Sequence, residues 1–416
     1  IDHIFHHQLY GISVTELTSL LSRRSVYCSK YPNSVYCVSH FGDAEGNIRY
    51  KRISHRWKNG KCVFCGAAQS KYDRDEVLET HAYELIHTSK PEDIFKMKFD
   101  VIISNPPYQL SDGGNGVSAS PLYHKFVEQS KKLKPHYMSM IIPARWYSGG
   151  KGLDEFRQTM LNDTHIKTLV DYTNSADCFP GVDIAGGVCY FLWDRDYTGE
   201  CLFTNSFNGN LTTAKRKLNE YSTFVRYPIA EGIIKKVSTE KNTAMDSMVT
   251  TRKPFGLATN TAPMSDGDLI LRYNKGTGKY KRSAVPYGQE YIDKWKVMMS
   301  YLSAEHAGQP DKNGMFRVLS TLEILPPASI CTETYLLAGC FQTEQEAINL
   351  KQYLSTKLVR FLIGQVAVSQ HITRGCFSFV PVQDFSKPWT DAELYAKYGL
   401  SGVEITFIES MIKPME

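Results

Sequence analysis

One short stretch of the sequence combines residue types suited to chemistry on an amino group. Residues 99–108 read Phe-Asp-Val-Ile-Ile-Ser-Asn-Pro-Pro-Tyr. An exocyclic aromatic amine is a poor nucleophile because its lone pair is delocalised into the ring. The Asn105 side-chain oxygen and the Pro106 carbonyl can each accept one of its N–H groups, and the two prolines hold these acceptors rigidly. Tyr108 offers a flat face on which a base removed from its helix can stack.

The residues before the prolines predict the element that positions this stretch. They are mostly β-branched or aromatic, and prolines cannot continue a strand, so we expect a central, buried parallel strand that stops at the carboxyl edge of a sheet. Ligands bind at that edge in open α/β sheets. Residues 105–108 are therefore the candidate active site.

This tetrapeptide after a strand resembles motif IV of the adenine-N6 DNA methyltransferases of type II and IIG restriction-modification systems, which use S-adenosylmethionine. The resemblance implies an α/β fold with a Rossmann-like, mixed seven-stranded sheet and helices on both faces. It assigns catalysis to Asn105, Pro106, Pro107 and Tyr108. Phe179 matches motif VIII, whose aromatic ring packs on the flipped base opposite the tyrosine. The structural alternatives are a proline turn and a core phenylalanine.

Three further positions, Gly11, Ile12 and Asp93, resemble the cofactor site of that family. The resemblance places Asn105 in the same site. Residues 8–12 predict a short strand, and the resemblance places Gly11 and Ile12 in the adenosine pocket. The family has an acidic residue directly after this pair, whereas this chain has Ser13. Glu16 is an alternative acid, although Ser13-Val-Thr-Glu16 also has the pattern of a helix capping box.

Asp93 matches a family acid that faces the adenine amine of the cofactor, and a solvated loop aspartate is the alternative. The glycine-rich turn that holds the methionine part of the cofactor is not found before residues 8–12. We therefore expect residues 1–416 not to methylate DNA alone and an upstream segment or a restriction subunit to complete the protein. The second hypothesis is a catalytically inactive DNA-specificity module, and the third is methylation of RNA or of a protein amide.

A cysteine-rich insertion is predicted over residues 28–75. Its Cys-x-x-Cys-Gly sequence at 62–66 is typical of a zinc knuckle, in which two thiolates converge on one metal. Free reduced thiols are the alternative interpretation. The predicted ligands of a structural zinc are Cys28, Cys37, Cys62 and Cys65, with His40 and His55 as alternatives.

The pattern of the catalytic part, residues 1–225, is that of alternating strands and helices. We expect a mobile loop over 111–120 and a polar crossover over 210–238. The predicted helices cover 14–26, 78–86, 121–133 and 153–161, and the predicted strands cover 137–143, 166–172 and 187–193.

Residues 240–416 lack regular alternation, and the resemblance implies an α+β target-recognition domain that binds double-stranded DNA. Basic and aromatic residues are interleaved there, which suits phosphate contact and base readout, although such clusters are often only solvated faces. The predicted DNA contacts are Arg145, Arg252, Lys253, Lys279 and Arg374.

The composition is compatible with these expectations. The 416 residues are 42% hydrophobic and carry a formal net charge of +5. There is no apolar run of about 18 residues and no signal peptide. We expect a prokaryotic cytoplasmic protein that does not enter a membrane.

Overall fold

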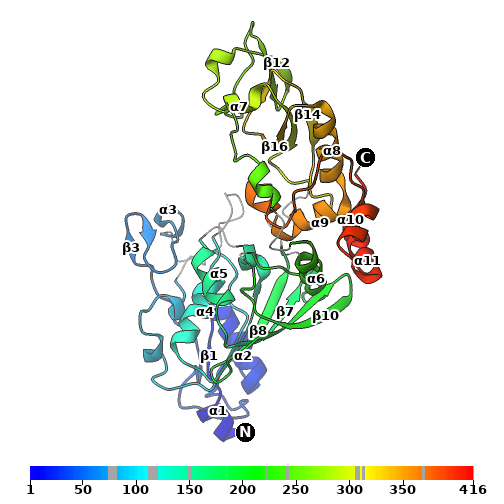
Figure 1. Cartoon of the computed structure of the whole chain (residues 1–416). Coiled ribbons are helices and arrows are strands. Elements are labelled where there is room, and N and C mark those ends of the chain that lie inside the picture. Colours follow the sequence, from blue (N-terminus) through cyan, green and yellow to red (C-terminus); the bar gives the residue numbers. More distant parts are fainter. Residues whose placement is uncertain are drawn as a thin grey trace.

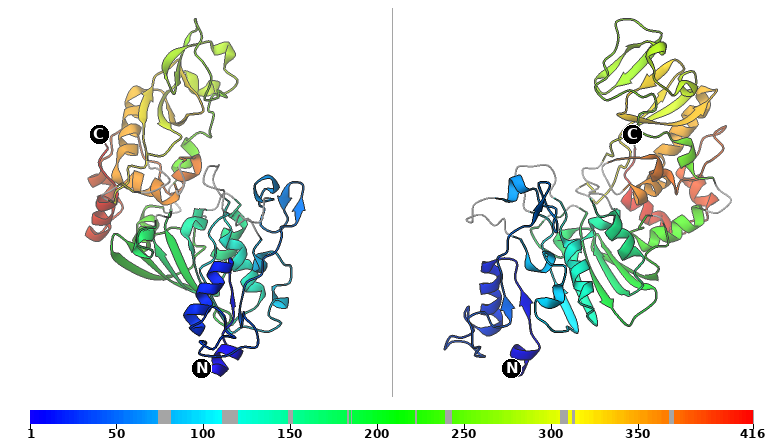
Figure 2. Two further views of the ribbon diagram at one scale, coloured as in Figure 1. Left: turned by 180° about the vertical axis from the view of Figure 1, so that it is seen from behind. Right: turned by 90° about the vertical axis from the view of Figure 1, so that its left-hand side faces the viewer.

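The computed structural model describes most of the chain, and the described residues form two connected parts. A mixed sheet with its N-terminal additions makes up one part, and the C-terminal half stands on the end of that sheet where α6 lies (Figure 1). The other two views show the same elongated arrangement, with the N-terminus at one end (Figure 2). The described residues are 1–73, 82–110, 120–148, 152–182, 184, 186–221, 223–238, 243–304, 310–311, 314–367 and 371–415.

The sheet of the first part has six strands in the order β10-β9-β7-β8-β6-β5. The pairs β5/β6 and β7/β9 are parallel, and the other three pairs are antiparallel. Its strands are β5 (Val101–Ser104), β6 (Tyr137–Pro143), β7 (Ile166–Tyr172), β8 (Val188–Asp194), β9 (Cys201–Phe207) and β10 (Asn210–Arg216).

The strand before the prolines lies at an edge, so the expectation of a central, buried strand is wrong for the described residues. β5 pairs only with β6 there. Its residues Val101 and Ile103 are 52% and 80% exposed. The apolar composition correctly predicted a strand parallel to its neighbour, but composition cannot distinguish a central strand from an edge strand.

Within the described residues, helices cover one face of this sheet, whereas the resemblance implies helices on both faces. Met138, Met140 and Ile142 of β6 are buried with α4 (Tyr123–Lys132) and α5 (Asp154–Leu161). Tyr190 and Leu202, on the opposite face, are 37% and 46% exposed. Short connections join β8 to β9 and β9 to β10. The second is the Asn208-Gly209 hairpin, in which both residues have positive φ. Such connections need no crossover helix, unlike those between parallel neighbours.

The expected crossover over 210–238 is wrong in its first part, because Asn210–Arg216 forms β10, which continues the sheet beside β9. The polar side chains of β10 are mostly exposed, which concealed the strand in the sequence. α6 (Pro228–Val237) then follows, and its buried face belongs to the core of the C-terminal half.

The N-terminal segment contains α1 (Asp2–His7), β1 (Gly11–Ile12) and α2 (Glu16–Tyr27), and β1 pairs in parallel with β2 (Ile48–Arg49). The predicted capping box of Ser13 and Glu16 is wrong. The capping box of α2 is formed by Thr15 and Thr18 instead. Ser13 N–H instead donates to the Arg49 carbonyl at 2.9 Å, which extends the β1/β2 ladder and delays the helix start.

Two leucines of this helix face solvent rather than the protein interior. Leu17 and Leu21 are 62% and 51% exposed, whereas Ser19, Arg23 and Tyr27 are buried. Arg23 Nε donates to the Ile48 carbonyl at 2.8 Å, so a polar contact orients the helix on β2.

The segment that precedes β5 contains short elements only. They are β3 (Trp57–Lys58), β4 (Lys61–Cys62), α3 (Gln69–Tyr72), η1 (Glu84–Ile86) and η2 (Pro91–Asp93). Of the helix predicted over 78–86, the part 78–81 lies outside the described residues, and the described remainder includes η1.

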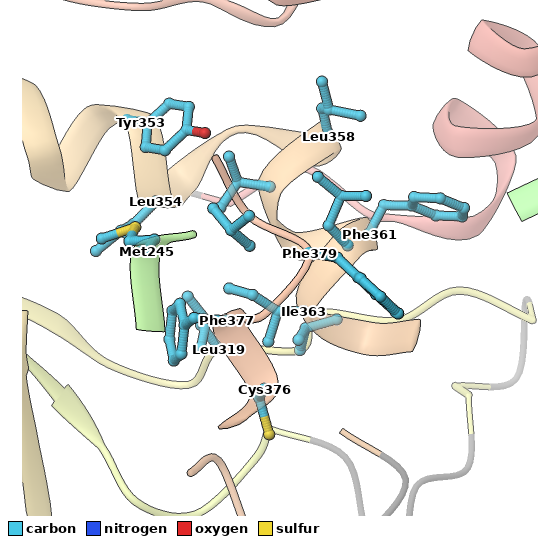
Figure 3. Packing of buried hydrophobic residues seen from close by; sticks show 14 of the residues in the cluster. Met245, Leu319, Tyr353, Leu354, Leu358, Phe361, Ile363, Cys376, Phe377 and Phe379 are labelled. Atoms are coloured by element: carbon cyan, nitrogen blue, oxygen red, sulfur yellow. The ribbon is translucent and has the colours of Figure 1, made fainter. Parts of the chain in front are cut away.

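The C-terminal half contains two three-stranded sheets, β12-β11-β15 and β14-β13-β16, followed by helices. One core lies between the sheets, and a larger one joins α6 to the C-terminal helices. Figure 3 shows Leu354 close to Met245 in this larger core, together with side chains such as Phe361 and Phe377. The elements are η5 (Met245–Met248), β11 (Leu269–Tyr273), β12 (Gly276–Tyr280), η6 (Arg282–Ala284), α7 (Gln289–Ile292), β13 (Trp295–Ser300), β14 (Leu322–Leu325), β15 (Ser329–Cys331), β16 (Tyr335–Phe341), α8 (Glu344–Ser355), α9 (Lys357–Val366), η7 (Arg374–Phe377), α10 (Asp391–Lys397) and α11 (Gly402–Met411).

None of the helices in the described part of the chain is long and apolar enough to span a bilayer.

A buried ion pair fixes the segment that links the sheet to α6. Asp171, on β7, has no exposed surface and accepts two hydrogen bonds from Arg226, at 2.6 and 2.7 Å. Asn205 Nδ2 on β9 donates to the same carboxylate at 2.7 Å. Burial lowers the pKa of Arg226, but the charge and hydrogen bonds of Asp171 outweigh this effect and raise it above its ordinary value, so the guanidinium stays charged.

We expect Arg226→Met to destabilise the protein by about 3 kcal/mol, because it leaves the Asp171 carboxylate buried without its counter-ion. The measurement is the free energy of the first urea unfolding transition. Arg282→Met is the matched control, since Arg282 makes a similar two-bond contact with Asp293 at the surface. An equal loss of stability in both variants would contradict the argument.

Candidate active site

A cavity of about 1000 Å³ lies at the carboxyl end of β5. Residues 10–14 around β1 border it on one side, and residues 101–109 border it on another. Its volume is at the upper end of the range for sites that take a cofactor-sized ligand. The cavity thus brings together two segments that the sequence assigned to one site.

The Asn105-Pro106-Pro107-Tyr108 stretch forms part of the cavity wall. Asn105 is exposed, and Pro106 is buried. Among the described residues, no hydrogen bond occupies the Asn105 side chain or the Pro106 carbonyl. Both acceptors therefore remain available to a ligand, as the proposed chemistry requires.

The chain that follows the two prolines is hydrogen-bonded to the residues just before α4. Leu122 N–H donates to the Tyr108 carbonyl at 3.0 Å, and Leu110 N–H donates to the Ser120 carbonyl at 3.1 Å. These bonds fix the start and end of the segment predicted as a mobile loop, whose residues 111–119 lie outside the described part. The backbone at Tyr108 is consequently tied to the residues that lead into α4.

The Tyr108 ring is half-buried, and its hydroxyl has no hydrogen-bond partner among the described residues. Burial raises the pKa of Tyr108 to about 12, with smaller contributions from the nearby Cys178 and Cys189. The phenol therefore stays neutral. Its role at the cavity is that of an aromatic surface rather than an acid or base.

Phe179 lines the same cavity as Tyr108. No contact with another aromatic ring is found for either residue within the described ranges, which leaves both rings free to face a ligand. Gly187, at the entry to β8, allows the loop to return close to the sheet: its φ is +78°, and a Cβ atom there would lie 2.1 Å from the Tyr172 carbonyl oxygen. A larger residue would displace the loop that carries Phe179.

The predicted cofactor residues separate into two groups. Gly11 and Ile12 line the cavity, and so does Ser13. Asp93 and Glu16 are exposed and do not contribute to the lining.

The carboxylate in the lining is Glu84, which sequence reasoning missed. Its Oε1 accepts from Arg49 Nη2 at 2.9 Å. Its Oε2 is buried without a partner in the described structure. No motif marked this residue, and only the folding of η1 against the cavity reveals it.

An aromatic cluster at the β1 end of the cavity was also missed. Tyr10, Phe95 and Phe99 all line it, with ring centroids 5.4 to 5.9 Å apart in edge-to-face orientation. Edge-to-face packing leaves flat apolar surface available to a planar ligand. Phe95 lies only two residues after the Asp93 position that the family resemblance singled out, which was the available signal.

The predicted DNA contacts lie in different environments. Arg145 is exposed and lines the cavity. Arg252 and Lys253 each lie 3.4 Å from the Glu333 carboxylate, and Arg252 also stacks over the Tyr301 ring. Their charges are partly compensated within the protein.

The other two cations are less engaged. Arg374 is exposed and donates through Nε to the Asp246 carbonyl at 2.8 Å. Lys279 is exposed on β12, at the end of the molecule far from α1 (Figure 1), and makes no ion pair with a described residue.

The four predicted cysteine ligands do not come together. Cys37 is buried against Tyr27 and Ile48, and Cys28 is exposed at the end of α2. Cys62 and Cys65 lie in a different cluster, next to α4. Their neighbours include two histidines: His55, which the sequence offered as an alternative ligand, and His87, which it did not. His40 does not join this group.

Comparisons with known proteins identify the family of the chain. Residues 7–179 match the family described as Eco57I restriction-modification methylase. An uncharacterized adenine-specific methylase of Mycoplasma pneumoniae is 32% identical over 291 residues, which are 61% of this chain and 68% of that protein. The shared sequence defines an enzyme of the adenine-specific DNA methyltransferase class. The chain belongs to the Eco57I restriction-modification methylase family.

Solved structures resemble the chain only distantly. The type IIG restriction endonuclease BpuSI aligns with 77% of this chain and 56% of its own length, at 11% identity and a TM-score of 0.33. The ATP-dependent type ISP restriction-modification enzyme LlaBIII, bound to DNA, aligns with 81% of this chain and 29% of its own, at 12% identity and a TM-score of 0.35. TM-scores this low do not establish a shared overall fold.

We expect Tyr108→Phe to leave the thermal midpoint unchanged or slightly higher, because the lost hydroxyl has no described partner and its removal leaves nothing unsatisfied. Tyr353→Phe is the control: it removes a buried hydroxyl that donates to the Pro381 carbonyl at 2.7 Å, and it should cost about 1 kcal/mol. Thermal scanning of both variants checks this. A clear loss of stability in Tyr108→Phe would mean that its hydroxyl is hydrogen-bonded after all.

Proposed function

We propose that this protein methylates the N6 amine of adenine in a specific double-stranded DNA sequence, with S-adenosylmethionine as methyl donor, in the cytoplasm of a prokaryote with a restriction-modification system. The observation that carries the proposal is the pair of unoccupied acceptors on Asn105 and Pro106 in the wall of a cofactor-sized cavity. Family membership supports the enzyme over a catalytically inactive specificity module.

The acceptors activate the amine by geometry. With one N–H bonded to the Asn105 oxygen and the other to the Pro106 carbonyl, the nitrogen moves toward tetrahedral geometry and its lone pair points away from the base. The adenine must leave the helix to reach them, and the rings of Tyr108 and Phe179 hold it there by stacking. No general base is needed before transfer, because the nitrogen loses its proton easily once it is cationic.

The cavity fits the adenosine part of the proposed cofactor. S-adenosylmethionine supplies a methyl group on a sulfonium sulfur. Gly11 and Ile12 with the aromatic cluster of Tyr10, Phe95 and Phe99 offer backbone and flat apolar surface to a purine. We propose that the unpartnered Glu84 Oε2, rather than Asp93, accepts a hydrogen bond from the cofactor.

The methionine part needs more than the described residues offer. β1 and β5 both border the cavity but do not pair with each other in the described structure, where the second edge of β5 has no partner strand. We propose that a strand with a glycine-rich turn, from a further segment or a partner chain, completes the cofactor site at this position.

We propose that DNA contacts the C-terminal half through cations that internal acids do not neutralise. Lys281 lies 3.1 Å from Asp266, and Arg282 contacts Asp268 and Asp293. Lys279, which precedes both of them in the sequence, makes no ion pair with a described residue. Charge that remains uncompensated attracts phosphates most strongly.

We expect Asn105→Ala to abolish methylation while DNA affinity changes by no more than a few fold, because the lost group stabilises the reacting nitrogen and not the duplex. The assay uses radiolabelled cofactor and, if residues 1–416 are inactive alone, the complete protein with its partners. Ser148→Ala, at the end of η3 (Ala144–Ser148) and outside the cavity lining, is the control. Methyl transfer by Asn105→Ala at the unmodified rate would refute the proposal.

We expect Lys279→Ala to weaken binding of all DNA sequences and to lower the slope of log affinity against log salt by about 0.9, as for one lost phosphate contact. Lys281→Ala should have a smaller effect, because Asp266 already neutralises Lys281. Arg374→Ala should instead weaken specific binding or relax one base preference. Binding titrations at several salt concentrations, with specific and scrambled DNA, separate these effects; identical slopes for Lys279→Ala and the unmodified protein would exclude the phosphate contact.

A further inference from the structure

We propose that His55, Cys62, Cys65 and His87 bind one structural zinc ion beside the active-site cavity. One potential ligand atom from each of the four residues lies within 4.8 Å of the others. In a tetrahedral site with Zn–S of about 2.3 Å and Zn–N of about 2.0 Å, ligand atoms are roughly 3.3–3.8 Å apart, so a small contraction completes the geometry. Two thiolates with two imidazoles favour zinc among the common metals.

The backbone around the cysteines is preformed for this role. β3 and β4 are joined by Asn59 and Gly60, both with positive φ, in a tight two-residue hairpin. Cys62 N–H donates to the Ala67 carbonyl at 2.9 Å, and Gly66 N–H donates to the Cys62 carbonyl at 3.0 Å. The chain therefore turns back on itself so that both thiols, each only 4% exposed as a residue, lie on the inside.

The histidines are oriented toward the thiols. The His87 ring is fixed by a hydrogen bond of 2.8 Å between Nδ1 and the Tyr83 carbonyl, in which Nδ1–H is the donor. This leaves Nε2 as the atom with a free lone pair, and Nε2 is buried without a described partner. A metal-bound histidine commonly donates its second N–H to a backbone carbonyl in this way. His55 Nδ1 lies 3.4 Å from Cys65 Sγ, which completes the group.

Four protein ligands leave no position for water, so the ion holds structure and does not act in catalysis. It joins the 55–66 hairpin to His87, and the residues just before His87, Tyr83 to Leu85, line the cavity. The same cluster contacts Leu122 and Phe126 beside α4. The metal would thus fix one wall of the active site onto the helix that follows the Asn-Pro-Pro-Tyr stretch.

The test is the zinc content of the full 416-residue chain, purified without chelator and measured by inductively coupled plasma mass spectrometry. We expect one zinc per chain in the unmodified protein and in Cys28→Ser, and a small fraction of that in Cys65→Ser and His87→Ala. Cys28→Ser is the matched control, because it removes a cysteine of the same segment that lies outside the cluster. Absence of zinc from the unmodified chain, or equal loss in Cys28→Ser and Cys65→Ser, would overturn the proposal.

Cobalt replacement keeps the proposal testable if the ligand variants do not fold. After exchange of the bound ion for Co²⁺ in the unmodified chain, we expect the visible bands of a tetrahedral site and thiolate-to-cobalt charge transfer of two thiolates. His87→Cys should retain the metal and raise that charge-transfer intensity by about half, as for three thiolates. Bands of an octahedral site, or an intensity of four thiolates in the unmodified chain, would show that other residues bind the ion.

Discussion

The two parts of the molecule depend on the buried pair of Asp171 and Arg226. Asp171 lies on β7, near the edge of the sheet where the cavity opens, and Arg226 stands just before α6, whose buried face belongs to the C-terminal core. The guanidinium also lies over the Tyr147 ring in η3 (Ala144–Ser148), the element that carries Arg145 to the cavity. A single compensated charge pair therefore sets the position of the sheet end, of η3 and of the chain that enters the C-terminal half.

At the site itself, rigidity comes from backbone rather than from side-chain networks. Two prolines follow β5, and the Tyr108 carbonyl is bonded to the chain that begins α4. The Asn105 amide and the Pro106 carbonyl remain without described partners because no neighbouring donor is positioned to occupy them. A reacting nitrogen therefore meets acceptors that are already in place and do not have to give up a hydrogen bond within the described structure, as expected of a preorganised site.

The sequence predicted well wherever local pattern decides the outcome. The strand over 137–143 and the strand over 166–172 match β6 and β7 at both ends. The sequence-based predictions were wrong where contacts with residues far away in the sequence determine the structure. Ser13 and Glu16 have the residue types of a capping box, but the Ser13 N–H is bonded to the Arg49 carbonyl in the ladder to β2. β5 has the composition of a central strand but lies at an edge, and Cys28 and Cys37 share a segment, not a cluster, with Cys62 and Cys65. Glu84 and His87 carry no motif, because only folding brings them to the cavity and to the thiols.

Glu84 and His87 belong to one short stretch, and this links the proposed metal to the proposed chemistry. The Tyr83 carbonyl holds the His87 ring, and the next residue, Glu84, presents its unpartnered oxygen at the cavity while Arg49 holds the other. A metal ligand and a cofactor-facing carboxylate three residues apart cannot move independently, since η1 spans the distance between them. Cys62 and Cys65 of the cysteine-rich insertion do not line the cavity. The insertion would instead act on the active site indirectly, by fixing His87 at the carboxyl end of η1. An insertion with little apolar content can hold such a position only if something other than a hydrophobic core secures it, and four converging ligands do so with few residues.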